Sequence, residues 1–450
     1  DSDILHLRVA GEDYIILNSH KAVIDLLEKR SVIYSGRYVL SIRSELMDIY
    51  LSWDRDLLVL PYGEDLKAHR KLFQQEFHPN NNVLHQPHEK KALVVFLNNL
   101  LDTPEDWLAH IRLMTGTIIF AIAYGIHVEH KDDPNIAAAE RMMAVLSAAG
   151  IPGTFLVDVF PILKYVPYWF PGASFKRKAR EWNGILSATI TPPFLKVKQA
   201  MADGTAEDCF SLRCLKNAKN PDSRLDHLSS EEEVIKETVG TIIRGGADTG
   251  VTALRTFFLA MTCFPHVQRE AQEELDRVVG KDRLPDHKDL DKDLLPYFWA
   301  VVNESFRYES FVNSFPHVAD ADDTYKGYHI PKGSIAIPNV WAICHDEKIY
   351  GPDVDSFEPK RWLLKTLDER GEGWKINPDM LDPMTVTFGF GRRVCPGKHM
   401  GLSSFRINAA SLLHSFNITP PLDKLGEPVI PKIEYISIGK TVLGKCYGIL

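Results

Sequence analysis

The fold of this chain of 450 residues is decided by the run Phe388-Gly389-Phe390-Gly391-Arg392-Arg393-Val394-Cys395-Pro396-Gly397. A thiolate that faces a large flat cofactor needs a rigid loop with glycines where the backbone approaches closely, and Gly391 and Gly397 meet this need. The helical pattern that follows would place its positive N-terminal end near the sulfur. An isolated cysteine in such a turn is more often a buried structural residue, but the ordered pattern around Cys395 predicts a ligand.

Composition narrows the class of protein. The chain is 45% hydrophobic and 25% charged, and its glycines and prolines are dispersed, so we expect one large domain over residues 1–450. A net charge of -8 argues against nucleic acid as a partner. The six cysteines form no C-x-x-C pair, which favours a reducing compartment over a disulfide framework or a zinc ribbon.

Apolar runs such as 113–126 and 142–157 fall short of the roughly 20 residues that a transmembrane helix needs, so we expect them in the core. The chain starts at Asp1 in strand-like sequence, and we expect that an N-terminal membrane anchor is missing from it.

Hydrophobic periodicity predicts a mainly α protein with small β-sheets. Helices are expected over 21–28, 64–77, 90–101, 112–124, 136–149, 229–264, 265–279 and 398–413. Strand patterns occupy residues 4–9 and 14–17, then 318–339, and a β-like stretch runs from 428 to 449.

The cysteine loop resembles the ligand loop of the cytochrome P450 superfamily, F-x-x-G-x-R-x-C-x-G, which is matched by Phe388, Gly391, Arg393, Cys395 and Gly397. The resemblance implies the P450 fold and a heme b cofactor whose iron is held by the Cys395 thiolate. It places Arg393 against a heme propionate.

A second motif, Gly245-Gly246-Ala247-Asp248-Thr249-Gly250, lies in the helix predicted around 231–264. Helical spacing puts Ile242, Gly245, Gly246 and Thr249 on one stripe and points Arg244 away from it. The glycines each cost about 1 kcal/mol relative to alanine, so they serve either close helix packing or a locally opened helix over the iron. The family pattern A/G-G-x-D/E-T implies the second use, with Thr249 and Asp248 as the catalytic pair that handles oxygen and protons.

Three E-x-x-R matches begin at Glu274, Glu304 and Glu358. The Glu274 pair is expected to be an ordinary ion pair on a helix surface, worth about 0.2–0.5 kcal/mol. Position singles out Glu304, because the family's P-x-R-F/W element follows at residues 357–362. The resemblance therefore implies a buried structural triad of Glu304, Arg307 and Arg361.

Two further positions concern the propionates. Arg70 matches the arginine of the family's W-x-x-x-R, whereas Leu66 replaces the tryptophan and cannot donate a hydrogen bond. His317 stands where the family commonly places another propionate partner, although a lone histidine is also compatible with a satisfied core residue.

The resemblance also implies partners. It predicts a monooxygenase that inserts one oxygen atom from O2 into a lipophilic substrate, with electrons from NADPH through a NADPH-cytochrome reductase. Lys67, Lys71 and Lys398 are candidates for a docking face. Residues expected to line the substrate site are Ile242, Ala247, Val312, Ser314 and Ile436.

The run 157–172 is similar to that of microsomal enzymes of basidiomycete wood-decay fungi. Its aromatic residues at 165–170, followed by the basic residues 176–178, suit peripheral contact with a membrane, although a proline-broken turn is an equal alternative. The resemblance implies the endoplasmic reticulum membrane, with the catalytic domain facing the cytosol.

Two alternatives stay open. A heme-thiolate isomerase, dehydratase or peroxygenase would keep Cys395 without needing Asp248 and Thr249. A non-enzymatic scaffold could hold a structural metal through Cys395 and His399, but no second pair completes tetrahedral coordination.

Overall fold

The computed structural model describes residues 2–9, 11–37, 56–130, 132–150, 155, 157, 160–170, 173–219, 229–310, 315–368, 371–431, 435–438 and 441–444. Two of the expected substrate-lining positions, Val312 and Ser314, lie outside these ranges. Ile436 lies on strand β10 (Tyr435–Ile438), where the structure describes the backbone and not the side-chain surroundings.

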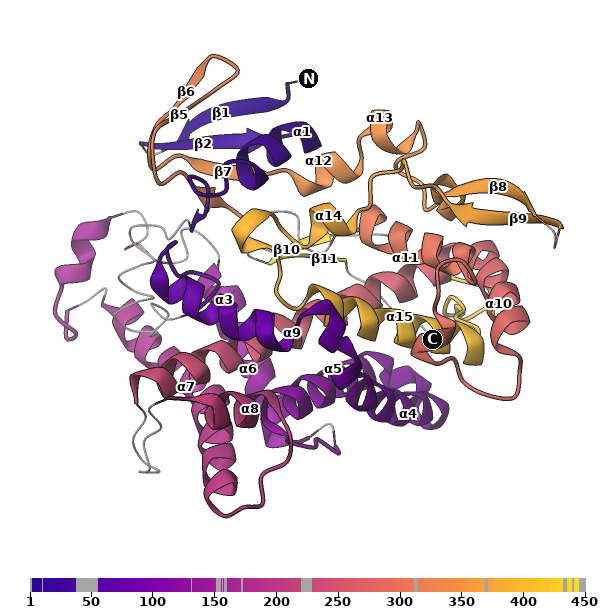
Figure 1. Cartoon of the computed structure of the whole chain (residues 1–450), viewed down its shortest axis with the longest axis horizontal. Coiled ribbons are helices and arrows are strands. Elements are labelled where there is room, and N and C mark those ends of the chain that lie inside the picture. The colour runs from indigo at the N-terminus through magenta and orange to yellow at the C-terminus, as the bar shows by residue number, and fades with distance from the viewer. Residues whose placement is uncertain are drawn as a thin grey trace.

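The mainly α prediction is confirmed, and small sheets lie around the helices (Figure 1). The longer helices are α3 (Glu64–Glu76), α4 (Gln86–Asp102), α5 (Trp107–Tyr124), α6 (Pro134–Gly150), α7 (Ser174–Ala202), α8 (Phe210–Asn217), α9 (Ser230–Cys263), α10 (Pro265–Val279), α11 (Pro296–Tyr308) and α15 (Lys398–Ser415). Short helices are α1 (His20–Val23), α12 (Val340–Cys344), α13 (Glu347–Tyr350) and α14 (Met384–Thr387).

The strands form one mixed sheet and three hairpins. The sheet has the order β1-β2-β7-β4-β3, and the hairpins are β5-β6, β8-β9 and β10-β11. The bounds are β1 (Ile4–Val9), β2 (Glu12–Leu17), β3 (Gly36–Arg37), β4 (His317–Val318), β5 (Asp323–Tyr325), β6 (Tyr328–Ile330), β7 (Ile335–Pro338), β8 (Leu363–Asp368), β9 (Gly371–Ile376) and β11 (Thr441–Gly444). The sheet joins the start of the chain to residues 317–338, because β2 pairs with β7 and β3 pairs with β4.

Some elements escaped the sequence analysis. Helix α7 runs through Pro192 and Pro193 although each removes a backbone donor, because its buried face, which includes Trp182, Leu186 and Phe194, packs into the core. The predicted helix over 21–28 is α-helical only to Val23 and continues as a π-helix, η1 (Ile24–Glu28). Tertiary packing outweighs local propensity in both cases.

The core lies between α5 and α9, which pack along each other behind α3 (Figure 1). One segment, Pro104–Tyr124, is long and apolar enough to cross a membrane by length and composition, but 78% of its most apolar window is buried in the protein. The prediction that the apolar run after residue 113 is a core segment is confirmed, since Ile118, Ile119 and Phe120 are buried.

Glu274 differs from its sequence prediction. It is buried, and its carboxylate accepts the backbone N–H groups of Tyr297 and Phe298 at 3.1 and 2.7 Å, which caps the N-terminus of α11. Arg277 stays largely exposed at 3.9 Å from it. The expectation of an ordinary surface ion pair is therefore wrong, because free N–H groups of a distant helix end bind this carboxylate.

Candidate active site

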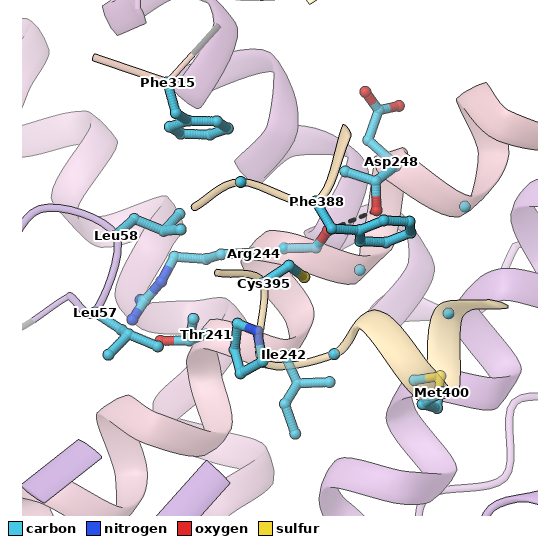
Figure 2. A pocket seen from close by; sticks show the side chains of 18 of the residues that line it. Leu57, Leu58, Thr241, Ile242, Arg244, Asp248, Phe315, Phe388, Cys395 and Met400 are labelled. Atoms are coloured by element: carbon cyan, nitrogen blue, oxygen red, sulfur yellow. Dashed lines mark hydrogen bonds between the residues drawn. The ribbon is translucent and has the colours of Figure 1, made fainter. Parts of the chain in front are cut away.

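A cavity of about 480 Å³ lies between α9, α3, α5 and the cysteine loop. Cys395, Phe388 and Gly397 line it from the loop side, while Gly245, Asp248 and Thr249 line it from α9 (Figure 2). The cavity brings together segments that are 150 residues apart in the sequence. It is large and mostly apolar, as is usual for sites that bind organic ligands.

The loop that carries Cys395 is held by its own backbone and by close packing. The Cys395 N–H donates to Phe388 O at 2.7 Å. Gly391 has a φ of 55° and packs against the backbone carbonyl of Leu27, where a β-carbon would collide. Its N–H donates to Glu28 Oε1 at 2.7 Å. The prediction of a glycine that permits close approach is confirmed at Gly391.

The Cys395 side chain is accessible from the cavity although protein surrounds it. Burial raises the pKa of its thiol, while the N–H of Gly397 and the charges of Arg70 and Lys398 act in the opposite direction. Gly397 precedes α15, so the N-terminal end of that helix lies beside the sulfur, as the sequence indicated.

Three arginines line the cavity without a carboxylate partner among the described residues: Arg37, Arg70 and Arg393. Burial and the charges of the other two lower the pKa of Arg37 to about 9, and burial with Arg70 lowers that of Arg393 to about 10. The Nε of Arg37 is buried without a hydrogen-bond partner. Such a cluster calls for an anionic ligand, because buried like charges repel each other.

Backbone carbonyls orient these guanidinium groups. Arg70 donates to Val394 O at 2.6 Å, Arg37 to Pro316 O at 3.0 Å, and Arg393 to Ser35 O at 2.8 Å. Carbonyl oxygens satisfy single N–H groups without neutralising the positive charges, and only Arg393 also feels an opposing carboxylate among the described residues, that of Asp320. Arg37 was not among the predicted site residues. The sequence feature that could have indicated it is its neighbour Gly36, which lets the short strand β3 pass close to β4.

His317 lies on β4 in the cavity wall. Its Nδ1 contacts Tyr34 O at 2.7 Å, and since a carbonyl only accepts, Nδ1 carries the proton. Burial and the charges of Arg37 and Arg393 lower its pKa to about 3, so the ring is neutral and Nε2 is an acceptor. His317 can therefore donate to an anion only if that anion raises its pKa.

The glycines of α9 serve the first of the two uses that the sequence left open, close helix packing. A β-carbon on Gly246 would meet Ile119 at 3.0 Å and one on Gly250 would meet Thr115 at 3.2 Å, so both pack against α5. Gly245 has open space and lines the cavity. The helix continues without an opened turn; instead, Thr249 Oγ1 donates to Gly245 O at 2.8 Å. The expectation of a locally opened helix is therefore wrong for this structure.

The catalytic pair that the sequence predicted lies at the cavity edge. Thr249 is accessible from the cavity, and the Asp248 carboxylate is directed away from Cys395 (Figure 2). Burial raises the pKa of Asp248, and Arg112 and Arg255 oppose that shift. Ile242 lines the cavity as expected. Ala247 does not, because it lies about 140° around the helix from Ile242 and packs against the core.

The sequence prediction for Arg244 is also wrong, but in the direction opposite to that for Ala247. Arg244 was expected to point away from the stripe, yet its side chain contributes to the cavity wall. A long side chain at the flank of the stripe reaches around the helix, and Asp56, from a segment far away in the sequence, holds it there with its carboxylate 2.5 Å from Nε. Asp56 was not among the residues that the sequence predicted for the site.

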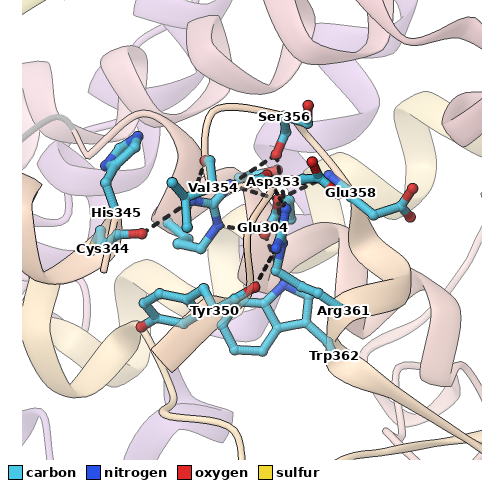
Figure 3. Close-up of polar contacts among 12 residues, drawn as sticks. Glu304, Cys344, His345, Tyr350, Asp353, Val354, Ser356, Glu358, Arg361 and Trp362 are labelled. Carbon is cyan, nitrogen blue, oxygen red and sulfur yellow. Dashed lines mark hydrogen bonds and ion pairs between the residues drawn. The ribbon is translucent and has the colours of Figure 1, made fainter. Parts of the chain in front are cut away.

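The predicted triad is present, with Glu304 and Arg307 fully buried and Arg361 half-buried at its edge (Figure 3). Glu304 accepts from Arg307 Nε and Nη2 at 2.8 Å each and from Arg361 Nε at 3.1 Å. Trp362 Nε1 and the N–H of Glu358 complete its coordination at 2.9 Å. Every oxygen of the buried carboxylate is thus paired, which offsets its desolvation cost.

Arg307 ties the triad to the end of α12 and to the segment that follows α13. Its Nη1 donates to Cys344 O at 3.0 Å and to Val354 O at 2.8 Å, and its Nη2 donates to Ser356 O at 3.0 Å. Arg361 donates to Asp353 O at 2.7 Å (Figure 3). The network fixes an irregular segment whose backbone carbonyls would otherwise lack partners.

Comparison with known proteins agrees with this geometry. A family model described as Cytochrome P450 matches residues 2–436. The chain belongs to the cytochrome P450 family. P450 membership implies a heme with a cysteine thiolate ligand, and Cys395 is the cysteine that lines the cavity.

Curated relatives are P450 monooxygenases of basidiomycete fungi. The chain is 38% identical to cytochrome P450 monooxygenase COX2 of Coprinopsis cinerea over 435 residues, which cover 96% of this chain and 80% of the relative. It is 37% identical to cytochrome P450 monooxygenase ple1 of Rhodocybe pseudopiperita, covering 97% and 80%. It is 38% identical to tryptamine 4-monooxygenase of Psilocybe cyanescens, covering 95% and 81%. The chain is thus an oxidoreductase of the P450 monooxygenase class.

Proposed function

We propose that residues 1–450 form a single catalytic domain that inserts one oxygen atom from O2 into a lipophilic substrate. The observation that carries the proposal is the cavity that joins Cys395 to three arginines without carboxylate partners and to the Asp248–Thr249 pair. Its walls come from α3, α5, α9 and α15, so both halves of the chain contribute to it. Its mostly apolar surface favours a lipophilic substrate.

The residues present fit a heme. Gly245 and Gly397 leave open space on the α9 side and the loop side of the cavity. Arg37, Arg70 and Arg393 provide three cations for the two propionates, and His317 would join them once an anion raises its pKa. Leu66 is a buried, apolar residue of the cavity wall. It cannot replace the hydrogen bond that the family's tryptophan at this position donates to a propionate. Phe388, Gly391 and Gly397 shape the ligand loop.

When bound, the heme with its Cys395 thiolate would supply the activation of O2 and the oxidation of the substrate. The protein holds the reacting groups in position and delivers protons to them. The Thr249 hydroxyl can exchange its bond to Gly245 O for one to a ligand. Asp248, directed toward Arg112 and Arg255, would carry protons from the outer side to Thr249.

We propose a NADPH-cytochrome reductase as the electron donor. Lys67 and Lys71 are exposed on α3. Lys67 lies over the Tyr62 ring together with the exposed Arg392 of the ligand loop, which gives a basic surface beside that loop. Lys398, the third residue expected there, turns inward and donates to Met384 O at 2.9 Å, so it is a weaker part of this surface.

Membrane association is proposed from exposed apolar side chains. Trp169 is 80% exposed, Tyr165 72% and Ile162 71%, all within residues 160–170. Arg177 and Lys178 are exposed nearby, whereas Lys176 is buried and lies over the Tyr168 ring. Aromatic and basic residues of this kind suit a membrane interface. The proposal places the protein at the endoplasmic reticulum membrane, with the catalytic domain facing the cytosol.

The heme-thiolate proposal predicts a specific spectrum. The heme-loaded protein, reduced and mixed with carbon monoxide, should show the Soret band typical of a thiolate ligand. Cys395→Ser should lose that band because the thiolate is gone, whereas Cys263→Ser, outside the cavity, should retain it. A thiolate band in the Cys395→Ser protein would exclude Cys395 as the ligand. A structural metal held by Cys395 and the exposed His399 predicts no such band in any variant.

A second prediction separates the monooxygenase from isomerase, dehydratase or peroxygenase activity. Thr249→Ala should raise hydrogen peroxide release per NADPH consumed by about tenfold, because the hydroxyl that manages protons is lost. Thr249→Ser keeps the hydroxyl and should stay near the parent. Equal peroxide release in the parent and Thr249→Ala would remove Thr249 from the mechanism.

A further inference from the structure

Arg244 is a charged residue in the cavity wall that the proposed oxygen chemistry does not use. It precedes Gly245 on α9, is 6% exposed, and lines the cavity. Its guanidinium group extends toward Leu57 and Leu58 (Figure 2). A cation at this place is costly unless its charge and its N–H groups are satisfied.

The charge is paired, but two of the three nitrogens, Nε and Nη1, make no hydrogen bond within the described residues. Asp56 Oδ2 lies 2.5 Å from Nε, and Nη2 donates to Glu237 Oε2 at 3.0 Å and weakly to Glu237 O at 3.4 Å. Nη1 makes no hydrogen bond to any residue that the structure describes. Nε is enclosed beside Asp56, so Nη1 is the charged donor of this side chain that a ligand in the cavity can reach.

The surrounding charges select the kind of partner. Burial opposes the charge of Arg244, yet Asp56 and Glu237 together raise its pKa, so it stays positive. Burial raises the pKa of Asp56, and the charge of Arg244 opposes that shift. Asp56 and Glu237 already flank this one cation, so an anionic ligand gains little from it. His69, which contacts Thr238 Oγ1 at 2.7 Å, has a pKa lowered to about 4 by burial and adds no positive charge.

A neutral oxygen accepts from Nη1 without bringing another charge, and an amine cannot accept from it once protonated. Most of the remaining wall near Arg244 is apolar and includes Leu57, Leu58, Ile118, Ile242 and Phe315. We propose that Arg244 anchors a carbonyl or hydroxyl oxygen of an otherwise apolar substrate through Nη1. This inference rests on the proposed monooxygenase function, because it concerns the substrate class of the same cavity.

The test compares ligands of one shape. Equilibrium dialysis of the heme-loaded protein measures the affinity for 4-phenylcyclohexanone, phenylcyclohexane, 4-phenylcyclohexanecarboxylic acid and 4-phenylcyclohexylamine. We expect the ketone to bind about tenfold more tightly than the hydrocarbon, the gain typical of a hydrogen bond from a charged donor. Tighter binding of the acid or the amine than of the ketone would overturn the proposal.

Two variants locate the effect. Arg244→Met combined with Asp56→Asn removes the donor without leaving Asp56 as an unpaired charge, and Arg244→Lys keeps the positive charge while removing Nη1. The ketone-to-hydrocarbon ratio should fall to about one in the first variant and drop severalfold in the second. Arg269→Met, at an exposed site on α10, is the matched control and should keep the parent ratio.

A ratio that is unchanged in both Arg244 variants would overturn the anchoring role. The carbon monoxide spectrum, recorded on the same samples, reports on the proposed function separately. A normal thiolate band without a preference for the ketone would contradict only the inference about Arg244. Absence of the band in the parent protein would contradict the proposed function itself.

Discussion

Glu304→Ala is expected to lower the free energy of unfolding by about 3–5 kcal/mol, the cost of leaving buried charges without their partner. Arg307 is fully buried and would lose both of its bonds to this carboxylate. Arg361 would keep its bonds to backbone carbonyls but lose its only carboxylate contact in the described chain. Chemical denaturation of the heme-loaded protein, followed by circular dichroism, measures the change.

Glu358→Ala is the matched control, since Glu358 also begins an E-x-x-R match. Among the described residues its carboxylate accepts only from the N–H of Lys360, at the start of a short 3-10 helix, so its loss should cost about 1 kcal/mol. If both variants lost the same stability, the buried network around Glu304 would not be the stabilising element that its geometry indicates.

Gly391→Ala is expected to lower the stability of the ligand loop by about 3 kcal/mol or more and to prevent stable heme loading. A φ of 55° alone costs a side chain about 1–2 kcal/mol, and the new β-carbon would also collide with the backbone carbonyl of Leu27. Backbone on both sides leaves little room for relief. The heme content of the purified protein and its melting temperature measure the effect.

Gly397→Ala provides the contrast within the same loop. Gly397 has a φ of -87° and open space where its β-carbon would lie, so the fold should tolerate the alanine with a melting temperature near that of the parent. The methyl group would enter the cavity, so heme content can fall without unfolding. A Gly391→Ala protein with parent-like melting temperature and heme content would show that the close contact to Leu27 is not required.

The candidate site could be predicted where one local pattern carries the chemistry. The ligand loop, Asp248 and Thr249, and the choice of Glu304 among three similar motifs all follow from residue types at short, ordered spacings, and the structure places the loop and the pair on one cavity. Helices with a clear apolar period, such as α9 and α10, were also predictable. The period of 3.6 residues is a property of the chain itself.

Other features required the packed structure. Helix α7 continues through two prolines because the core favours its buried face, and Glu274 is buried because the start of α11 arrives beside it. Ala247 and Arg244 exchanged their expected sides because the cavity curves around α9 toward Asp56. No local rule predicts which distant segment will face a given side of a helix.

The amino-acid sequence by itself determined which cysteine lies in the cofactor loop, the order of the motifs and the largely helical character of the chain, because these depend on neighbours within a few residues. The tertiary structure alone decided that Arg37 joins Arg70 and Arg393, and that Asp56 and Glu237 flank Arg244 in the cavity wall. These contacts join residues far apart in the chain. Their existence depends on how buried surfaces pack, and the packing of the whole core settles it.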